Sequence, residues 1–289
     1  VQTSAASKNF NISFKDSSAQ EPYDAVIVAT GSAVGGYQIA EQLGHDIVTP
    51  VPSLFTLNCK HDIKQEGELL HGLQGLSVPH ARVSLSKKQW QEGPLLITHH
   101  GISGPAVLKL SAFAARDFKE RNYRCPITIN WDVQNFGTNI ESMVDILSQI
   151  GSIKPKRKVA NVCPLRDNTI PKRLWASLCH VSGFGDDDVW GSAKKTSIRR
   201  LATNLLACPI ETTGKGTFKE EFVTAGGVDL KQIDMKTMSS KLRPGLFFCG
   251  EVINIDGITG GYNFLNCWST GHVAGVAASQ FVARNSSEQ

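Results

Sequence analysis

The sequence lacks any apolar segment that approaches the ~18 to 20 residues needed to cross a lipid bilayer. Hydrophobic residues make up 41% of the chain and charged residues 19%, and the mean hydropathy is -0.14. This composition excludes both an integral membrane protein and a disordered, low-complexity chain. With 289 residues, the chain is long enough to bury one large or two small hydrophobic cores. We therefore expect a folded protein that has no membrane partner.

Also missing is any pair of cysteines with the C-x-x-C spacing. The seven cysteines are an odd number, which fits poorly with a framework of disulfides. We therefore predict free thiols in an intracellular, reducing compartment, either the cytoplasm or an organelle, and we predict no metal site. The chain begins at Val1 rather than Met, which favours a removed targeting segment or a piece of a longer protein.

A dense basic stripe of the kind found in nucleic-acid-binding proteins is missing too. The 30 Lys and Arg residues barely exceed the 26 Asp and Glu residues, which gives a formal net charge of +4. This mild balance does not indicate nucleic acid as a partner. A small-molecule substrate is the partner that we expect, and the composition leaves the oligomeric state open.

Two apolar segments end in glycine. Alternating residues at 10–14 and a β-branched run at 23–31 predict a hairpin that leads into a strand buried on both faces and ending at Gly31. Near the other end of the chain, residues 246–249 form an apolar strand just before Gly250. Open α/β sheets bind ligands at the carboxyl ends of their strands, so both glycines are candidates for a ligand site.

The hydrophobic pattern of the residues between these two strands changes twice, which predicts an α/β domain interrupted by an insert. Short β-like segments in the first and last parts of the insert, with helical periods between them, predict a β-rich part and a helical part. The predicted boundaries are 1–51 and 222–289 for the α/β domain and 52–221 for the insert, which is β-rich at about 52–131 and 208–221 and helical at about 132–207.

The strongest candidate site follows the second strand. It comprises Gly250, Glu251, a loop through Asp256, and then Thr259, Gly260, Gly261, Tyr262 and Asn263 at the start of a helix expected to reach about Ala283. Adjacent glycines let a ligand approach the bare backbone, and the positive end of the helix favours a phosphate or the pyrimidine edge of a flavin. Glu251 is placed to accept hydrogen bonds from sugar-like hydroxyls. The alternative is a tight turn with a surface carboxylate.

Two further features have structural alternatives. Gly271 and Gly275 share a face of the same helix, which predicts close packing on the sheet. His99 is a candidate catalytic residue, because a histidine side chain can move protons near neutral pH. The structural alternative makes Ser103 the N-cap of a helix with Pro105 in its first turn, and leaves His99 hydrogen-bonded at a strand end.

Several segments, in this order along the chain, resemble one flavoprotein family. They are Val28–Gly31, Gly44–His45 followed by Pro50 and Pro52, Thr98–Pro105, Phe222–Val228, Thr237–Lys241 and Gly250–Asn263. They are similar to stretches of the BaiN/YhiN-like (aminoacetone oxidase-like) FAD-dependent oxidoreductases, which include Ala-Thr-Gly and Thr-His-x-Gly-x-Ser-Gly-Pro. The resemblance covers about residues 23–280 and is weakest in the helical part of the insert.

The resemblance implies an α/β fold with an FAD-binding Rossmann-like domain of the glutathione reductase type, interrupted by an insert that is part β-barrel-like and part helical. It implies FAD as the cofactor of the full-length protein and leaves open whether NAD(P)H is the electron donor. The candidate cofactor-binding residues are Thr30, Gly31, Gly250, Glu251, Asp256, Thr259, Gly260, Gly261, Tyr262 and Asn263.

Two features of that family are missing. The G-x-G-x-x-G motif that cradles a dinucleotide occurs nowhere in the sequence, and residues 31–36 run almost directly into the next helix, where the family has a longer glycine-rich loop. The Rossmann-like domain is therefore incomplete in its AMP half. The sequence supports an FAD-dependent oxidoreductase of unknown substrate, or alternatively a truncated, non-catalytic form that acts as a structural or partner-binding protein. A flavin-dependent modifier of nucleic acid is a third hypothesis, which the net charge supports little.

Overall fold

The computed structural model describes residues 10–13, 20–59, 63–161, 163, 170–216 and 223–287. The chain divides into two compact units, each with its own hydrophobic core. Unit 1 comprises Val1–Ser53 and Val223–Gln289, and unit 2 comprises Leu54–Phe222. The predicted boundary at residue 222 lies outside the described residues. The strand β4 (Ile47–Ser53) continues through the other predicted boundary, between residues 51 and 52.

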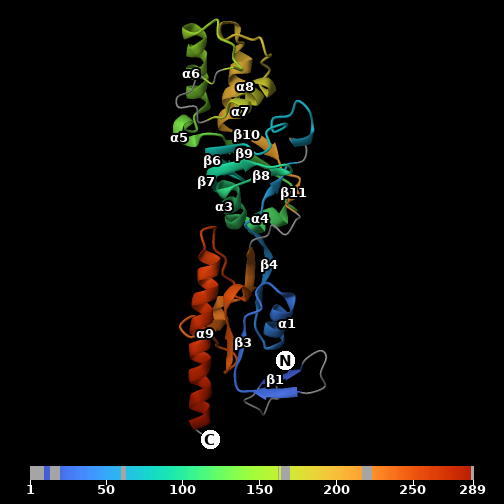
Figure 1. Cartoon of the computed structure of the whole chain (residues 1–289), viewed down its shortest axis with the longest axis vertical. Helices are drawn as coiled ribbons and strands as arrows, with labels where there is room; N and C mark the ends of the chain where they lie inside the picture. Colours follow the sequence, from blue (N-terminus) through green and yellow to red (C-terminus); the bar gives the residue numbers. More distant parts are fainter. Residues whose placement is uncertain are drawn as a thin grey trace. The chain divides into compact units, whose positions relative to one another are not determined.

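Unit 1 contains two sheets that join strands from both ends of the sequence (Figure 1). One sheet has the order β13 (Ile233–Asp234), β14 (Ser239–Ser240), β15 (Leu246–Phe248), β3 (Val26–Val28), and the other pairs β4 with β12 (Val223–Val228). The strands β3 and β15 are parallel, with Ile27 opposite Phe247. This pairing agrees with the prediction that the two glycine-terminated strands belong to one α/β domain.

The strand β3 is less buried than predicted. Only Val28 of its three residues is buried, and Ile27 is 40% exposed. Within the described part of the chain β3 pairs with β15 alone, so one of its edges is open. The hairpin is formed by β1 (Phe10–Ser13) and β2 (Gln20–Tyr23) rather than by β1 and β3. The β-branched run indicates a strand that is usually covered on both faces, but burial depends on neighbours that the run does not encode.

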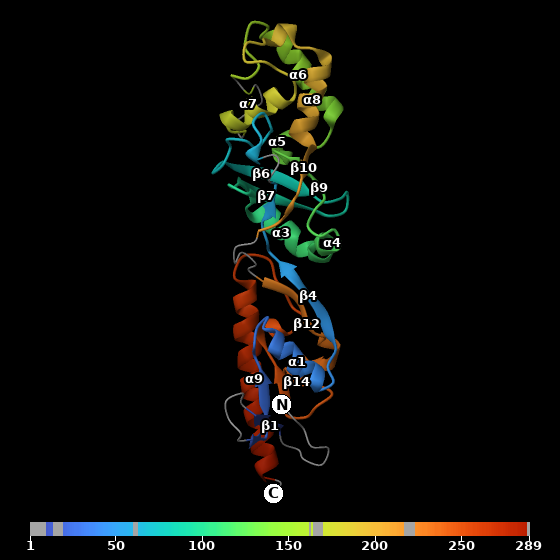
Figure 2. The same ribbon diagram turned by 90° about the vertical axis from the view of Figure 1, so that its right-hand side faces the viewer.

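Two helices cover the sheets of unit 1. The helix α9 (Tyr262–Ser287) lies along β3, β14 and β15, and α1 (Val34–Gln42) lies beside β4 and β12 (Figure 2). The prediction that Gly271 and Gly275 pack on the sheet is wrong, since a Cβ built on either would meet no atom within 4 Å. The helix packs instead through Thr270, Ala274 and Ala278, which repeat every four residues on one face.

Unit 2 is built on a seven-stranded sheet with the order β10-β9-β6-β7-β8-β5-β11. Its strands are β5 (Leu57–Asn58), β6 (Ser77–Ser84), β7 (Trp90–Ile97), β8 (Gly101–Ser103), β9 (Pro126–Asn130), β10 (Cys208–Glu211) and β11 (Gly214–Lys215). The two outermost strands belong to one continuous segment, 208–215, which pairs with β9 and then with β5. One segment therefore joins both edges of the sheet, which gives a barrel-like arrangement.

Helices lie on both sides of this sheet (Figures 1 and 2). On one side are α3 (Pro105–Phe113) and α4 (Ala115–Glu120), and on the other are α5 (Val133–Phe136), α6 (Ile140–Ile153), α7 (Lys172–Val181) and α8 (Lys195–Leu206). Short 3-10 turns are η2 (Trp190–Ser192) here and η3 (Leu230–Gln232) and η4 (Gly250–Val252) in unit 1.

The start of α3 differs from the structural alternative proposed for Ser103. Ser103 ends β8 opposite Leu96, and the helix begins at Pro105 after Gly104. Gly104 has φ 94°, a conformation that favours glycine, and it takes the N-cap position without any side-chain hydrogen bond. Ser103 is therefore a strand residue rather than a helix cap.

Three further findings bear on the function classes. No helix formed by the described residues has the length and apolar character needed to traverse a bilayer. The same residues contain no group of three or more His, Cys, Asp or Glu side chains arranged to hold a metal ion. None of the seven cysteines, all of which lie within the described residues, is joined in a disulfide.

Candidate functional site

The parallel pairing of β3 and β15 brings two glycines to the same edge of the sheet. Gly31 has φ 61° and Gly250 has φ 75°, conformations that glycine adopts readily. A Cβ built on Gly31 would lie 3.7 Å from Oε2 of Glu251, so the two strand ends are in direct contact. We call the region formed by Gly31, Gly250, Glu251 and the loop 256–263 the strand-end site.

Glu251 is held in place by the backbone of a neighbouring strand. Its Oε1 accepts a hydrogen bond of 2.8 Å from the backbone N–H of Thr224 in β12. The strand β12 can come this close because Gly227 lacks a side chain, and a Cβ there would lie 2.4 Å from the carbonyl oxygen of Val252. Within the described residues Oε2 accepts no hydrogen bond. Glu251 therefore has a fixed orientation and one spare acceptor oxygen.

A buried tyrosine adds a hydrogen-bond donor to this region. Tyr37 in α1 is 6% exposed, and its hydroxyl has no hydrogen-bond partner among the described residues. Burial and, second, the negative charge of Glu251 raise the pKa of Tyr37, so the hydroxyl stays protonated. An unsatisfied buried hydroxyl costs about 1 to 3 kcal/mol, which a ligand or a water can relieve. Sequence reasoning missed Tyr37, because a tyrosine in a short apolar helix is usually part of the core.

The loop before α9 is closed by Asn263. Its side-chain amide accepts a hydrogen bond of 2.8 Å from the N–H of Gly257 and donates one of 3.0 Å to the carbonyl of the same residue. Gly260 and Gly261 follow with φ 121° and 86°. A Cβ built on Gly261 would meet nothing within 4 Å, so the backbone at the helix start borders open space. This bare backbone at the positive end of a long helix suits an anionic or electron-rich group.

The helix α9 is tied to the end of β15. The N–H of Gly250 donates a hydrogen bond of 2.9 Å to Oγ1 of Thr270, and a Cβ on Gly250 would lie 3.6 Å from Sγ of Cys267. Burial and, second, the neighbouring Cys267 raise the pKa of the Cys249 thiol, so Cys249 is a poor nucleophile. These contacts fix the position of the glycine-rich loop relative to the strand ends.

The remaining candidate residues of unit 1 lie around these groups. Thr30 packs its side chain against Gly36 of α1, and Asp256 accepts a hydrogen bond of 3.0 Å from the hydroxyl of Ser53. Thr259 is half-buried, whereas Tyr262 is 56% exposed beside Gly260. Ser53 is a second residue that sequence reasoning missed, because its partner is 203 positions away in the chain.

His99 belongs to unit 2 and is exposed. It lies in a turn in which Oγ1 of Thr98 accepts hydrogen bonds from the N–H groups of His100 and Gly101, at 3.3 and 3.1 Å. The side chain of His99 makes no hydrogen bond within the described part of the chain, which does not support the structural alternative. A catalytic role for His99 stays a prediction.

Comparison with known proteins finds one matching family and several relatives. The model of the HI0933-like protein Rossmann domain family matches residues 2–277. The chain is 31% identical over 251 residues to a "Ribosomal RNA dihydrouridine synthase" of Haemophilus influenzae, which covers 86% of this chain and 57% of that protein. It is 29% identical over 264 residues to the protein of the same name in Escherichia coli, covering 89% of this chain and 58% of that protein.

A third relative carries a different name. The chain is 27% identical over 281 residues to a "3-dehydro-bile acid delta(4,6)-reductase" of Clostridium scindens, covering 90% of this chain and 63% of that protein. The chain thus spans less than two thirds of the length of each of these relatives. The family match extends over both units, and the parallel strands of unit 1 that end at Gly31 and Gly250 agree with it. The chain therefore belongs to the HI0933-like protein Rossmann domain family.

Proposed function

We propose that this chain is the part of an FAD-dependent oxidoreductase that holds the flavin end of the cofactor, and that the reaction reduces a carbon–carbon double bond. The observation that supports the proposal is the strand-end site. There the carboxyl ends of two parallel strands, a fixed glutamate and the bare N-terminus of a 26-residue helix meet in one unit.

The groups of the strand-end site fit the flavin end of FAD. The spare oxygen of Glu251 is an acceptor for hydroxyls of a ribityl chain, and the buried hydroxyl of Tyr37 is a donor without a partner among the described residues. The open backbone at Gly261 and the positive end of α9 suit the electron-rich pyrimidine edge of the ring. The residues Thr30, Gly31, Gly250, Asp256, Thr259, Gly260, Tyr262 and Asn263 complete the proposed site.

The nucleotide end of FAD has no comparable site here. The sequence contains no G-x-G-x-x-G motif, whose backbone N–H groups would hold the pyrophosphate. The open edge of β3 is the position at which a further parallel strand could pair. We therefore expect this chain to bind FAD weakly, and a unit that supplies the missing motif to strengthen binding.

The chain's own residues orient and stabilise the group that they hold. Bound flavin supplies hydride transfer, and NAD(P)H is the electron donor that we propose. The N–H of Thr224 holds the carboxylate of Glu251 in one orientation. The side chain would therefore not have to reorient to accept a hydrogen bond from a ribityl hydroxyl. The backbone donors at the start of α9 are part of the helix, and they would stabilise negative charge on a bound group without moving.

The names of the relatives suggest the substrate. Forming dihydrouridine from uridine reduces a ring double bond conjugated to a carbonyl group, and a delta(4,6)-reductase also acts on a conjugated double bond. We propose a uridine in ribosomal RNA as the substrate, because two of the relatives described above carry the name ribosomal RNA dihydrouridine synthase. The expectation of a small-molecule substrate is the competing proposal, and the name of the bile acid relative supports it.

Titration with FAD and with riboflavin tests the flavin site. Riboflavin has the ring and the ribityl chain but no phosphate or adenosine, so a chain that holds only the flavin end should bind both with Kd values within about threefold of each other and weaker than about 1 μM. Glu251→Ala should weaken both by about tenfold, and Glu41→Ala, on the exposed surface of α1, should change neither.

Two results would contradict the flavin proposal. Sub-micromolar binding of FAD that riboflavin does not share would show that the nucleotide end is held as well. The absence of flavin fluorescence quenching with either ligand would remove the strand-end site as a flavin site.

A second candidate function is a non-catalytic, partner-binding role without flavin. The outer face of α9 exposes Leu265, Trp268 and Val276 at 59, 71 and 45%. Large apolar side chains that are exposed on one helix can mark a surface that contacts another protein. The titration with FAD and riboflavin separates the two candidates, because a partner-binding role requires no flavin binding. For such a role, Glu251→Ala should also leave the binding of a partner unchanged.

A further inference from the structure

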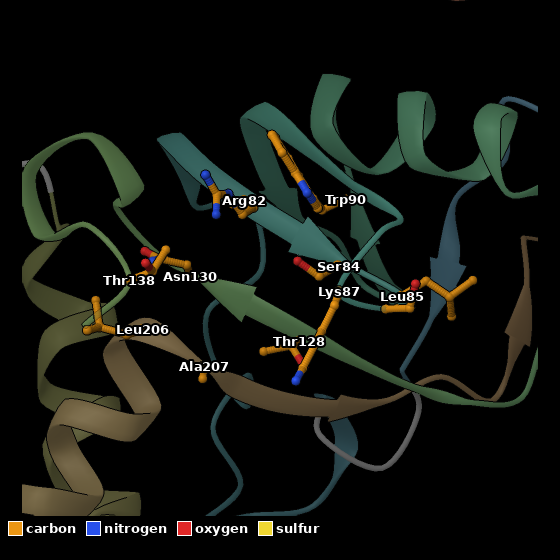
Figure 3. A pocket seen from close by; sticks show the side chains of 11 residues that line it. Arg82, Ser84, Leu85, Lys87, Trp90, Thr128, Asn130, Thr138, Leu206 and Ala207 are labelled. Atoms are coloured by element: carbon orange, nitrogen blue, oxygen red, sulfur yellow. The ribbon is translucent and has the colours of Figure 1, made fainter. Parts of the chain in front are cut away.

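Unit 2 contains a groove whose residues form no part of the strand-end site. It has a volume of about 650 Å³, within the usual range for ligand sites. Its walls come from β6, the following turn, the start of β7, β9 and the end of α8 (Figure 3). No carboxylate is among the described residues that line it.

Strand alternation explains the polar lining of the groove. Along β6 and β9, buried Val83 and Ile129 alternate with the lining residues Arg82, Ser84 and Thr128. The sheet register places Ser84 between Trp90 on β7 and Thr128 on β9. One aromatic ring and two hydroxyls therefore form a row across three strands.

Two cationic side chains adjoin this row. Arg82 lies 4.3 Å from the centre of the Trp90 ring, and it forms an ion pair with Glu92, whose Oε1 lies 2.7 Å from Nε and 2.5 Å from Nη2 of Arg82. This pairing fixes the guanidinium and still leaves N–H groups for a ligand. Lys87, in the turn after β6, is exposed and has no ion pair within the described residues. Trp90 is 42% exposed, so part of its ring is accessible.

The charge of the chain is distributed unevenly between the two units. Residues 54–222 contain 23 Lys and Arg against 16 Asp and Glu, a formal charge of +7. The other residues contain 7 against 10, a charge of -3. The modest total of +4 therefore hides a basic unit, and that unit contains the groove.

We infer that this groove binds a single-stranded segment of RNA, with a base stacked on Trp90 and with Lys87 and Arg82 beside the phosphates. An aromatic ring next to cations is the common arrangement for single-stranded nucleic acid, and the hydroxyls of Ser84, Thr128 and Thr138 suit 2′-hydroxyls and base edges. The inference rests on the proposed RNA substrate, and it assigns the contact with that substrate to unit 2.

The test is fluorescence anisotropy of the full chain with a fluorescein-labelled oligouridine RNA of about 12 nucleotides. Trp90→Ala should weaken binding at least about fivefold, because base stacking is lost, whereas Trp90→Phe should stay within about twofold of the unmodified chain. Lys87→Ala should reduce the slope of log K against log salt by about 0.7 between about 50 and 200 mM KCl.

Two variants in the same unit serve as controls. Phe113→Ala removes an aromatic ring that is 65% exposed on α3, and Lys119→Ala removes an exposed cation on α4. Neither residue lines the groove, so Phe113→Ala should leave RNA binding unchanged and Lys119→Ala should leave the salt slope unchanged. Circular dichroism of each variant checks that it is folded.

The outcomes separate this inference from the flavin proposal. If the unmodified chain binds RNA and Trp90→Ala and Lys87→Ala bind it equally well, the groove is not the RNA site. If the unmodified chain does not bind RNA even at about 50 mM salt, both the groove and the RNA substrate are refuted. Riboflavin binding is measured on the same samples. Riboflavin binding should be unchanged in Trp90→Ala, and this measurement tests the strand-end site independently of the groove.

Discussion

Replacing each of two glycines of unit 1 by alanine should affect stability and flavin binding to different extents. Gly227 and Gly261 both have positive φ, at 123° and 86°, but only Gly227 is enclosed. A Cβ on Gly227 would lie 2.4 Å from the carbonyl oxygen of Val252, whereas a Cβ on Gly261 would meet no atom within 4 Å. Gly227→Ala therefore tests the packing of the site, and Gly261→Ala tests the space in front of it.

The structure sets the size of the two effects. Gly261→Ala adds only the strain of a positive φ, about 1 kcal/mol. Gly227→Ala adds that strain and a backbone clash, since real Cβ atoms essentially never approach closer than 3.0 Å. Relieving the clash means separating β12 from η4, which also disturbs the hydrogen bond of 3.1 Å from Asn254 to Val228. The total cost should be about 2 to 4 kcal/mol.

The two variants should rank in the opposite order for flavin binding: Gly261→Ala, which costs less stability, should lose more binding than Gly227→Ala. Gly261→Ala places a methyl group in the open space where the ring would approach the backbone, so it should abolish riboflavin binding at little cost in stability. Gly227→Ala should weaken riboflavin binding only as far as Glu251 moves away from the N–H of Thr224.

Urea unfolding followed by circular dichroism measures the stability of both variants, and fluorescence quenching measures riboflavin binding. Hydrogen exchange of peptides covering 223–228 and 250–254 should show faster exchange in Gly227→Ala. Equal stability losses for the two variants would refute the close packing of β12 on η4. Unchanged riboflavin binding by Gly261→Ala would show that no ring lies at the start of α9.

Three further predictions concern the support of the site. Asn263→Ala removes both hydrogen bonds to Gly257 and should lower the free energy of unfolding by about 1 to 2 kcal/mol, and Asn263→Asp, which keeps only the acceptor, should lie between it and the unmodified chain in urea unfolding. Phe248→Ala empties a fully buried position and should cost about 3 to 5 kcal/mol in the same assay; a loss below about 1 kcal/mol would contradict its place in the core. Burial lowers the pKa of His45 in the folded state, so the unfolded chain takes up the proton first and stability should fall as pH drops below about 6.5, by at most about 1.4 kcal/mol at about pH 5.5. His45→Gln should remove this part of the pH dependence, and an unchanged pH profile would contradict the prediction.

Glycine positions were predictable because they depend on local backbone geometry. Gly31, Gly250, Gly260 and Gly261 were selected from the sequence as strand ends or helix starts, and all four have positive φ. Such conformations are set by a residue and its immediate neighbours, so a short pattern suffices to indicate them.

Burial was less predictable because it depends on residues far away in the chain. The apolar run at 23–31 predicts a buried strand, yet Ile27 is 40% exposed since β3 has one neighbour among the described residues. The spacing of Gly271 and Gly275 predicts packing, yet the packed face of α9 is that of Ala274 and Ala278. In both cases the pattern was compatible with two environments, and the tertiary structure selected one.

The contents of both candidate sites were also decided by tertiary contacts. The carboxylate of Glu251 accepts a hydrogen bond from the N–H of Thr224, which lies 27 positions earlier. Burial and, second, the charge of Glu251 raise the pKa of Tyr37, which belongs to a helix from the other end of the chain. Trp90 and Thr128 join one row only through the register of β6 with both of its neighbours. No sequence spacing encodes such meetings.

By itself the sequence determined the elements whose causes are local, namely the glycine-terminated strands, the long helix after Gly261 and the absence of a G-x-G-x-x-G motif. It also determined the net charge of +4, but not that the charge divides into a basic and an acidic unit. Only the tertiary structure decided which strand ends meet, which apolar residues stay exposed and which polar groups share a site. The reason is that these properties arise from contacts between residues distant in sequence, whereas composition and periodicity report only on each segment and its own preferences.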